Sequence, residues 1–287
     1  HDEDEDQPPE VHRASIPDPF PRAVSLVVGT VRDMARLVLT PFGRPALEAL
    51  ATVVADAQGE DPLAPVTVVV PSAPAAVSVR RALGRRASAG LANVRTLALP
   101  QLVNLLGDAR VAGGGRRLVT KAWAAAAVRA GLEDAPSPLD AVYASAAVEE
   151  ALIATFARLR ELTDAELRAL EKRSPRAAAV IDRYRDHRGR LQDHLDHHDL
   201  AVAAVEALRT GAPVGDDLGA VVLYLPRRIG RDYLELIEAL AARTPVTAVV
   251  GITGDEDGDR PLRRLVEQLQ PVLGPPGAPP AVPDPVP

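Results

Sequence analysis

The chain has 287 residues, with 33 basic and 39 acidic side chains and a formal net charge of −6. Six of the acids lie in residues 1–10, which carry no basic side chain, so the rest of the chain is neutral. A neutral chain lacks the global basic footprint of a nucleic-acid-binding domain and leaves only a local arginine stripe for such contacts. The absence of cysteine excludes disulfides, cysteine-ligated zinc and iron–sulfur clusters from these residues and fits a reducing compartment.

The sequence predicts no membrane segment. No apolar run approaches the roughly 18 residues that span a bilayer. The start also lacks the basic region and apolar segment of a signal peptide, so we expect a cytoplasmic protein. Because the sequence begins with His1 and ends in a proline-rich stretch, we expect a fragment of a longer protein.

The two ends differ in composition from the rest of the chain. Residues 1–34 form an acidic, proline-punctuated tail that we predict to be disordered. Residues 271–287 are rich in proline and poor in large apolar side chains, which predicts a linker.

Five short apolar runs, rich in β-branched residues, predict strands at 36–40, 66–70, 94–97, 221–225 and 246–251. Runs without polar alternation are typical of parallel strands that are covered on both faces. Amphipathic helical patterns lie between them. The alternation predicts an α/β fold with a parallel, doubly wound sheet.

The middle of the chain has helical patterns and no convincing strand. We therefore predict an all-helical subdomain over residues 116–208, inserted into a discontinuous α/β domain made of residues 35–115 and 209–270.

The loop after the first predicted strand lies where a phosphate-binding loop would be. Such a loop needs glycines whose N–H groups cradle phosphates, a lysine for the phosphate oxygens and a hydroxyl residue for magnesium. Here Pro45 replaces the second glycine and removes an N–H donor, and Ala46 and Leu47 replace the lysine and the hydroxyl residue. A plain strand–turn–helix connection is therefore favoured over a bound nucleotide. The residues of this degenerate loop are Thr40, Pro41, Gly43, Arg44, Ala46 and Leu47.

The order of the segments resembles that of a UvrD-type superfamily-1 helicase, and more closely the AddB/RecC-like subunit of bacterial helicase–nucleases, which are PD-(D/E)XK nuclease family proteins. The matching segments are residues 40–47 for Walker A, 70–76 and 96–102 for the next two motifs, 198–200 before Walker B, 223–233 for Walker B, and 249–251 for the motif after it.

The departures from active helicases all concern ATP hydrolysis. Leu225 and Pro226 stand in place of the Asp-Glu pair that ends the Walker B strand, and Ile252 stands in place of the later aspartate. Together with Ala46, these changes are the AddB/RecC pattern. The resemblance therefore implies a P-loop helicase-like fold that has lost hydrolysis, with no cofactor and no catalytic residue in this stretch.

The resemblance also implies a role. The chain would be a helicase-like scaffold in DNA double-strand-break repair and recombination, belong to an exonuclease, pair with a motor helicase subunit, and guide single-stranded DNA weakly through its phosphates. Candidate contacts are Arg44, Arg80, Arg81, Arg85, Arg86 and Arg95.

The nuclease itself is expected downstream. Its metal site needs an acid two residues before a lysine. Only Lys121 and Lys172 occur here, and Val119 and Leu170 precede them. Two other functions stay open: a regulatory domain that binds a nucleotide without turnover, and a structural protein–protein interaction module.

Three further features carry an interpretation each. His187, His194, His197 and His198 cluster with Asp193, Asp196 and Asp199, and the spacing of His194 and His198 places both on one helix face, where they could share a metal. A solvated helix end is favoured.

Trp123 is interpreted as core, with a base-stacking platform as the alternative. The acidic run at 255–259 is interpreted as a solvated loop rather than a metal site.

Overall fold

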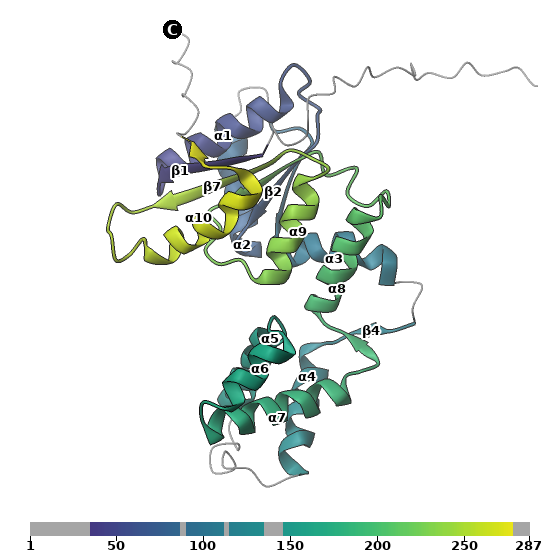
Figure 1. Ribbon diagram of the computed structural model, residues 1–287. Helices are drawn as coiled ribbons and strands as arrows, with labels where there is room; N and C mark the ends of the chain where they lie inside the picture. The colour runs from purple at the N-terminus through teal and green to yellow at the C-terminus, as the bar shows by residue number, and fades with distance from the viewer. Residues whose placement is uncertain (1–34, 87–89, 112–114, 135–145, 278–287) are drawn as a thin grey trace, which may run out of the picture.

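The computed structural model describes residues 35–86, 90–111, 115–134 and 146–277, without the side chains of 108–111. Its centre is a six-stranded sheet in the order β3-β2-β6-β7-β1-β8, in which every pairing is parallel (Figure 1). The strands are β1 (Arg36–Pro41), β2 (Val66–Val70), β3 (Val94–Ala98), β6 (Ala220–Tyr224), β7 (Val246–Ile252) and β8 (Pro276–Gly277). The predicted α/β fold with a parallel sheet is confirmed.

Helices cover both faces of the sheet. On one face, α1 (Arg44–Gln58) and α2 (Ala73–Arg86) share a core with Val68 and Val249. The opposite face packs against α3 (Leu99–Val111), α8 (His197–Arg209), α9 (Arg231–Ala241) and α10 (Arg260–Leu273). All five residues of β2 are buried, which explains why its run of valines shows no polar alternation.

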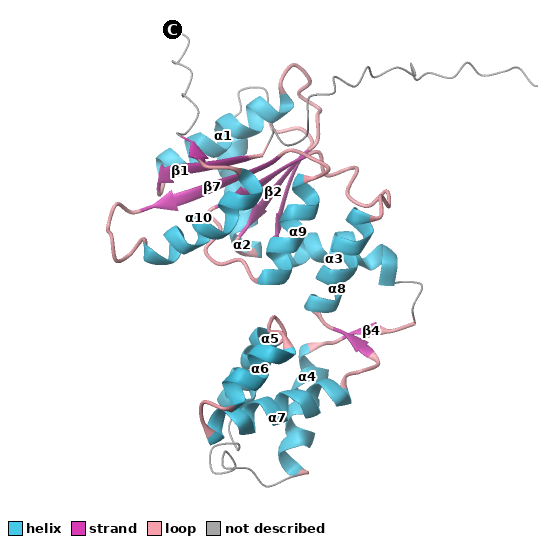
Figure 2. Cartoon of the chain, in the orientation of Figure 1, coloured by secondary structure: helices cyan, strands magenta, loops and turns pink. Residues whose placement is uncertain are grey.

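A separate block of four helices lies below the sheet in Figure 2. It consists of α4 (Lys121–Glu133), α5 (Ala146–Leu159), α6 (Asp164–Glu171) and α7 (Pro175–Arg190). Phe156, Ile181 and Tyr184 are buried in a core of their own. Helices α4, α6 and α7 begin at side-chain caps, such as Thr163, whose hydroxyl accepts from the N–H of Glu166 in a capping box.

The helical segment differs from the prediction in two ways. It contains two short strands, β4 (Arg117–Leu118) and β5 (His194–Leu195), which pair in parallel and connect the block to the sheet. In addition, α8 belongs to the sheet core, so the block ends before residue 208. Close packing of α8 on α3 is the reason, because a Cβ on Gly107 would lie only 2.8 Å from the backbone oxygen of Leu200.

The predicted chain ends lie mostly outside the described residues, and only residues 271–277 can be compared with the structure. The predicted tail, residues 1–34, lies outside the described residues, as do residues 278–287 of the predicted linker. Residues 271–277, however, belong to the domain. Helix α10 continues through Pro271 to the buried Leu273, and β8 then pairs with β1. Across the described ranges, helices of the length and apolarity needed to cross a bilayer are absent.

Gly219 provides a test of this packing. It has a φ of +61°, and a Cβ there would lie 1.7 Å from the backbone oxygen of Pro65. We expect Gly219→Ala to lower the free energy of unfolding by more than about 2 kcal/mol, because the left-handed backbone alone costs an alanine about 1–2 kcal/mol. Gly84→Ala, in open space on α2, should instead stabilise by about 0.5–1 kcal/mol. Urea unfolding measures both; equal effects would contradict the packing at Gly219.

Candidate functional site

The predicted phosphate-loop position is a tight connection between β1 and α1. Gly43 precedes α1 with a φ of +84°, and Pro45 occupies the first turn of the helix. Ala46 is fully buried against the sheet, and Thr40 is 1 % exposed. The side chain of residue 46 therefore points into the core, so it does not face the loop in which a phosphate would sit.

Two apolar side chains lie beside this connection, at the ends of the neighbouring strands. The chain leaves β1 toward the face of α1 and leaves β7 toward the face of α10, and open α/β sheets bind ligands at such a reversal. Here a Cβ on Gly251 would lie 2.6 Å from the ring of Phe42 and 2.7 Å from Cδ2 of Leu225. The side chains of Phe42 and Leu225 thus converge over Gly251, and we call them the Phe42–Leu225 plug.

The loop after β7 is likewise occupied. The carboxylate of Asp259 accepts hydrogen bonds from the N–H groups of Thr253 and Gly254 at 2.8 and 2.9 Å, and from the Thr253 hydroxyl. These bonds, the Thr253 N–H first, lower the pKa of Asp259. A helix-preceding loop of this kind otherwise offers its N–H groups to an anion. The protein's own carboxylate takes that place here.

The acidic run at 255–259 is therefore only partly a solvated loop. Asp255, Glu256 and Asp257 are exposed, but Asp259 is 4 % exposed and holds the turn. No group of three potential metal ligands is found within the described ranges.

The candidate DNA-binding arginines do not form one surface. Arg44 and Arg86 both contact Glu48, at 2.7 and 3.6 Å. Arg95 pairs with Asp217 at 2.9 Å. Its neighbour on β3, Val94, belongs to the core under α2, so the alternation of the strand places Arg95 on the opposite face of the sheet. Arg80, Arg81 and Arg85 are exposed on α2.

A cavity of about 620 Å³ lies between the helical block and the sheet domain. Its walls are largely apolar, with Phe156, Leu191 and Leu195 among them. The polar residues that line it come from both sides and are Asn104, Thr120, Lys121, Arg160, Glu161, Tyr184, His187, Arg188, Asp196, His197, His198, Asp232 and Tyr233.

Three of the four clustered histidines, His187, His197 and His198, line this cavity, so the cluster is more than a solvated helix end. His187 is only 8 % exposed, and burial lowers its pKa, which keeps the imidazole neutral. His194 lies on β5 and His198 on α8, with Asp196 as the cap between them, so the predicted pair on one helix face is wrong. A local spacing rule could not show that a strand and a helix start meet at this point.

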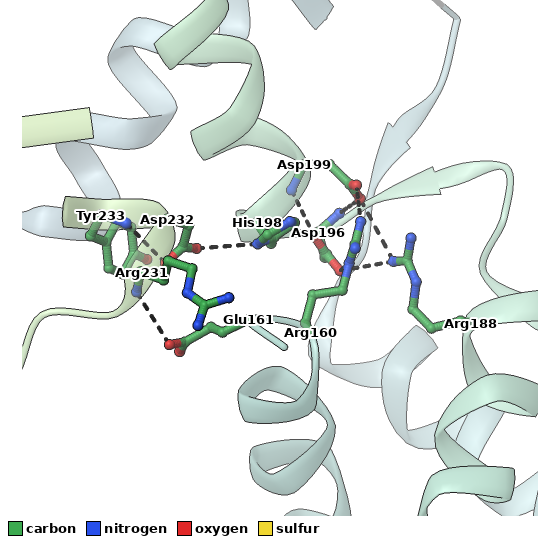
Figure 3. Close-up of polar contacts among 9 residues, drawn as sticks. All are labelled: Arg160, Glu161, Arg188, Asp196, His198, Asp199, Arg231, Asp232 and Tyr233. Atoms are coloured by element: carbon green, nitrogen blue, oxygen red, sulfur yellow. Dashed lines mark hydrogen bonds and ion pairs between the residues drawn. The ribbon is translucent and has the colours of Figure 1, made fainter. Parts of the chain in front are cut away.

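Four charged side chains join the two parts of the chain beside the cavity (Figure 3). Arg160, directly after α5, contacts Asp199 at 2.6 Å and Asp196 at 3.3 Å. Arg188 on α7 contacts Asp196 at 2.9 Å and Asp199 at 3.7 Å. The two aspartates also form the capping box that starts α8. We call these four residues the Arg–Asp network.

A second ionic contact lies at the start of α9. Arg231 contacts Glu166 of α6 at 3.0 Å, and its backbone N–H donates to Glu161 at 3.4 Å. The hydrogen bond from Arg231 lowers the pKa of Glu166 to about 2. Gly230 lies next to this contact, since a Cβ there would lie 2.8 Å from the Glu161 carboxylate, which would have to shift. Sequence reasoning missed Arg160, Arg188 and this contact. Arg160 and Arg231 have partners 36 or more residues away, beyond the reach of a local pattern.

Among the described residues, four buried polar atoms have no hydrogen-bond partner: Asn104 Oδ1, His187 Nδ1 and His198 Nδ1, from residues that line the cavity, and His194 Nδ1 on β5. His198 Nδ1 lies 3.5 Å from Asp232, at the limit of an ion pair. Burial raises the pKa of Tyr184, and raises that of Tyr233 to about 12.

Trp123 differs from its expectation. Its side chain is 57 % exposed on α4, and its ring lies 5.2 Å from that of His194. The interpretation as core is therefore wrong.

The chain matches no protein family, and no curated protein is significantly similar to it.

Arg160→Met tests the Arg–Asp network. The side chain of Arg160 is 24 % exposed, so we expect a loss of about 1–2 kcal/mol in unfolding free energy, less than the 3–5 kcal/mol of a fully buried pair. Arg44→Ala removes an ion pair whose arginine is 83 % exposed, and should change stability by less than about 0.5 kcal/mol. Denaturant unfolding compares the two. A smaller effect at Arg160 than at Arg44 would contradict a structural role for the network.

Acid should weaken the same network. Burial opposes ionisation of Asp199, but the N–H of Asp196 and the nearby Arg160 and Arg188 outweigh it, so its pKa is lowered. Its stabilisation is thus fully present above the unfolded pKa of about 3.9 and lost as pH falls through the lower folded pKa. The stability difference between wild type and Asp199→Asn should be constant from about pH 5 to 7 and shrink below about pH 4. Thermal unfolding across this range measures it; a difference that grows on acidification would contradict the network.

Proposed function

We propose that the chain is a non-hydrolytic, helicase-like scaffold of a bacterial helicase–nuclease that acts in DNA double-strand-break repair and recombination. In this role it pairs with a motor subunit in the cytoplasm and guides single-stranded DNA. The order of the sequence motifs supports the family. The Phe42–Leu225 plug carries the claim that the domain hydrolyses no ATP.

The plug argues against ATP hydrolysis because it lies where a phosphate-binding site would be. A phosphate-binding site needs free N–H groups, a lysine and acidic residues for magnesium at the carboxyl ends of the strands. At this edge, Ala46 is buried, Leu225 and Phe42 lie over Gly251, and Asp259 accepts hydrogen bonds from the N–H groups of the loop after β7. Each change alone would weaken a nucleotide site, and together they replace it with packing.

The same observation argues against a regulatory domain that binds nucleotide without turnover, since such a domain would still need the phosphate cradle. The remaining alternative, a protein–protein interaction module, predicts no affinity for DNA. The proposal assigns DNA cleavage to residues outside this sequence.

The proposal predicts that the chain binds single-stranded DNA and does not bind ATP. Titration with magnesium–ATP should give no saturable binding at millimolar concentration, and no hydrolysis above background with or without DNA. A fluorescent oligothymidylate should bind in the micromolar range, with an affinity that falls steeply with salt because phosphates are the main contacts. A mixed-sequence oligonucleotide of equal length should bind alike.

Each arm can fail separately. Measurable ATP turnover would contradict the non-hydrolytic role. Absence of DNA binding would favour the interaction module, and a pull-down with a motor helicase would then test that alternative. Tight, salt-insensitive and sequence-specific binding would contradict phosphate guidance.

A further inference from the structure

The exposed Trp123 is the only tryptophan of a chain in which aromatics make up 3 % of the residues. Helix α4 already buries Ala124, Ala127 and Val128 on its core face. The indole does not complete that core, and its 57 % exposure leaves a large apolar surface in solvent. An exposed aromatic ring of this size is a common contact for a ligand with a flat face.

The surroundings of Trp123 form a defined surface. The ring of His194 lies 5.2 Å away, tilted by 36°. His194 is in register with Arg117 across the β4–β5 pair, so the side chains of both lie on one face of this small sheet. The other pair, Leu118 and Leu195, lines the inter-domain cavity. We call Trp123, His194 and Arg117 the Trp123 platform; Lys121, two residues before Trp123 on α4, is exposed and lines the cavity beside it.

The platform is locally basic, although the chain as a whole is not. Residues 109–132 contain five basic side chains and no acid. Arg117 and Lys121 are exposed, and neither has an ion-pair partner in the part of the chain that the structure describes. In contrast, Arg44, Arg86 and Arg95 are each paired with a carboxylate. The acid adjoining the platform in sequence is Asp193, beside His194, and it is exposed.

We propose that the Trp123 platform binds single-stranded DNA, with an unpaired base stacked on the indole of Trp123 and the flanking phosphates held by Arg117 and Lys121. The combination of an exposed π-surface and unpaired cations is the one that binds single strands without sequence readout. This inference rests on the proposed function for the identity of the ligand. It moves the main contact from the arginines of α2 to the β4–α4 segment.

The single tryptophan makes the test direct. Oligothymidylate is titrated into the full chain at low salt while Trp123 emission and the anisotropy of a labelled strand are both recorded. We expect saturable quenching with the same midpoint as the anisotropy. Trp123→Ala should weaken binding at least about 5-fold, and Trp123→Phe, which keeps a stacking ring, should stay within about 2-fold of wild type.

The phosphate contacts have their own readout. Arg117→Ala and Lys121→Ala should each reduce the slope of log affinity against log salt by about 0.7, the value for one phosphate contact on a single strand. Trp123→Ala should leave that slope unchanged, because it removes a stacking contact and no charge. Arg168→Ala, the same change at an exposed site on α6, should alter neither affinity nor slope. An abasic oligomer of equal length should bind more weakly and leave the emission unchanged.

The outcomes separate the two proposals. DNA binding that leaves the Trp123 emission unchanged and is insensitive to Trp123→Ala overturns the platform, while the proposed scaffold role stands. Equal binding and quenching by the abasic oligomer also overturns it. Absence of DNA binding by the wild type contradicts both. Trp123 is exposed, so all variants should keep the wild-type thermal midpoint and circular dichroism spectrum, and Trp123→Phe tests stacking even if the alanine variant unfolds.

Discussion

The Arg–Asp network is the constraint on which the arrangement of the two parts depends. The helical block has its own apolar core, and so does the sheet domain, but the described apolar clusters do not merge into one. What joins them is polar: Arg160 and Arg188 reach from the block to Asp196 and Asp199, which at the same time begin α8. Partly buried ion pairs contribute little net stability but strongly favour one geometry over others, because a displaced partner leaves a charge unpaired in a low dielectric. The network therefore acts on orientation, and the cavity and the β4–β5 pair follow from it.

The carboxyl ends of the strands and the junction with the helical block differ in the groups that they leave exposed or unpaired. Open α/β sheets bind ligands at the carboxyl ends of their strands. At the carboxyl ends of β1 and β7, Phe42 and Leu225 lie over Gly251, and Asp259 accepts hydrogen bonds from the N–H groups of the following loop. Leu225 has a φ of +49°, an unusual conformation for a leucine, which fits a side chain held in place by packing over Gly251. At the junction with the helical block, by contrast, polar atoms lack protein partners and an aromatic ring is exposed. The unpartnered polar atoms and the exposed ring therefore lie at the junction and not at the sheet edge.

The basic side chains differ in whether they form ion pairs, so the charge of a local surface can differ from the net charge of the chain. Several arginines are neutralised at short range, for example Arg95 by Asp217 and Arg231 by Glu166. Arg117 and Lys121 are exposed and have no ion-pair partner within the described ranges, whereas Arg129 of the same stretch pairs with Glu149. A chain with a net charge of −6 can thus present a small cationic surface beside an exposed aromatic ring.

The sequence by itself determined the layers. All five principal strands lie within one residue of their predicted bounds, because continuous β-branched runs such as 66–70 require burial on both faces wherever they are placed. The helices follow from amphipathic spacing and capping residues in the same way. Only the tertiary structure decided which faces meet. The two-residue strands β4 and β5 have no periodicity to detect, α8 joins the sheet because Gly107 admits it, and Trp123 is exposed because alanines already fill the core side of α4. A local sequence pattern indicates how much of a segment is buried. It does not show which distant residue a side chain contacts, because partners 36 or more residues apart are brought together by the packing of the whole chain.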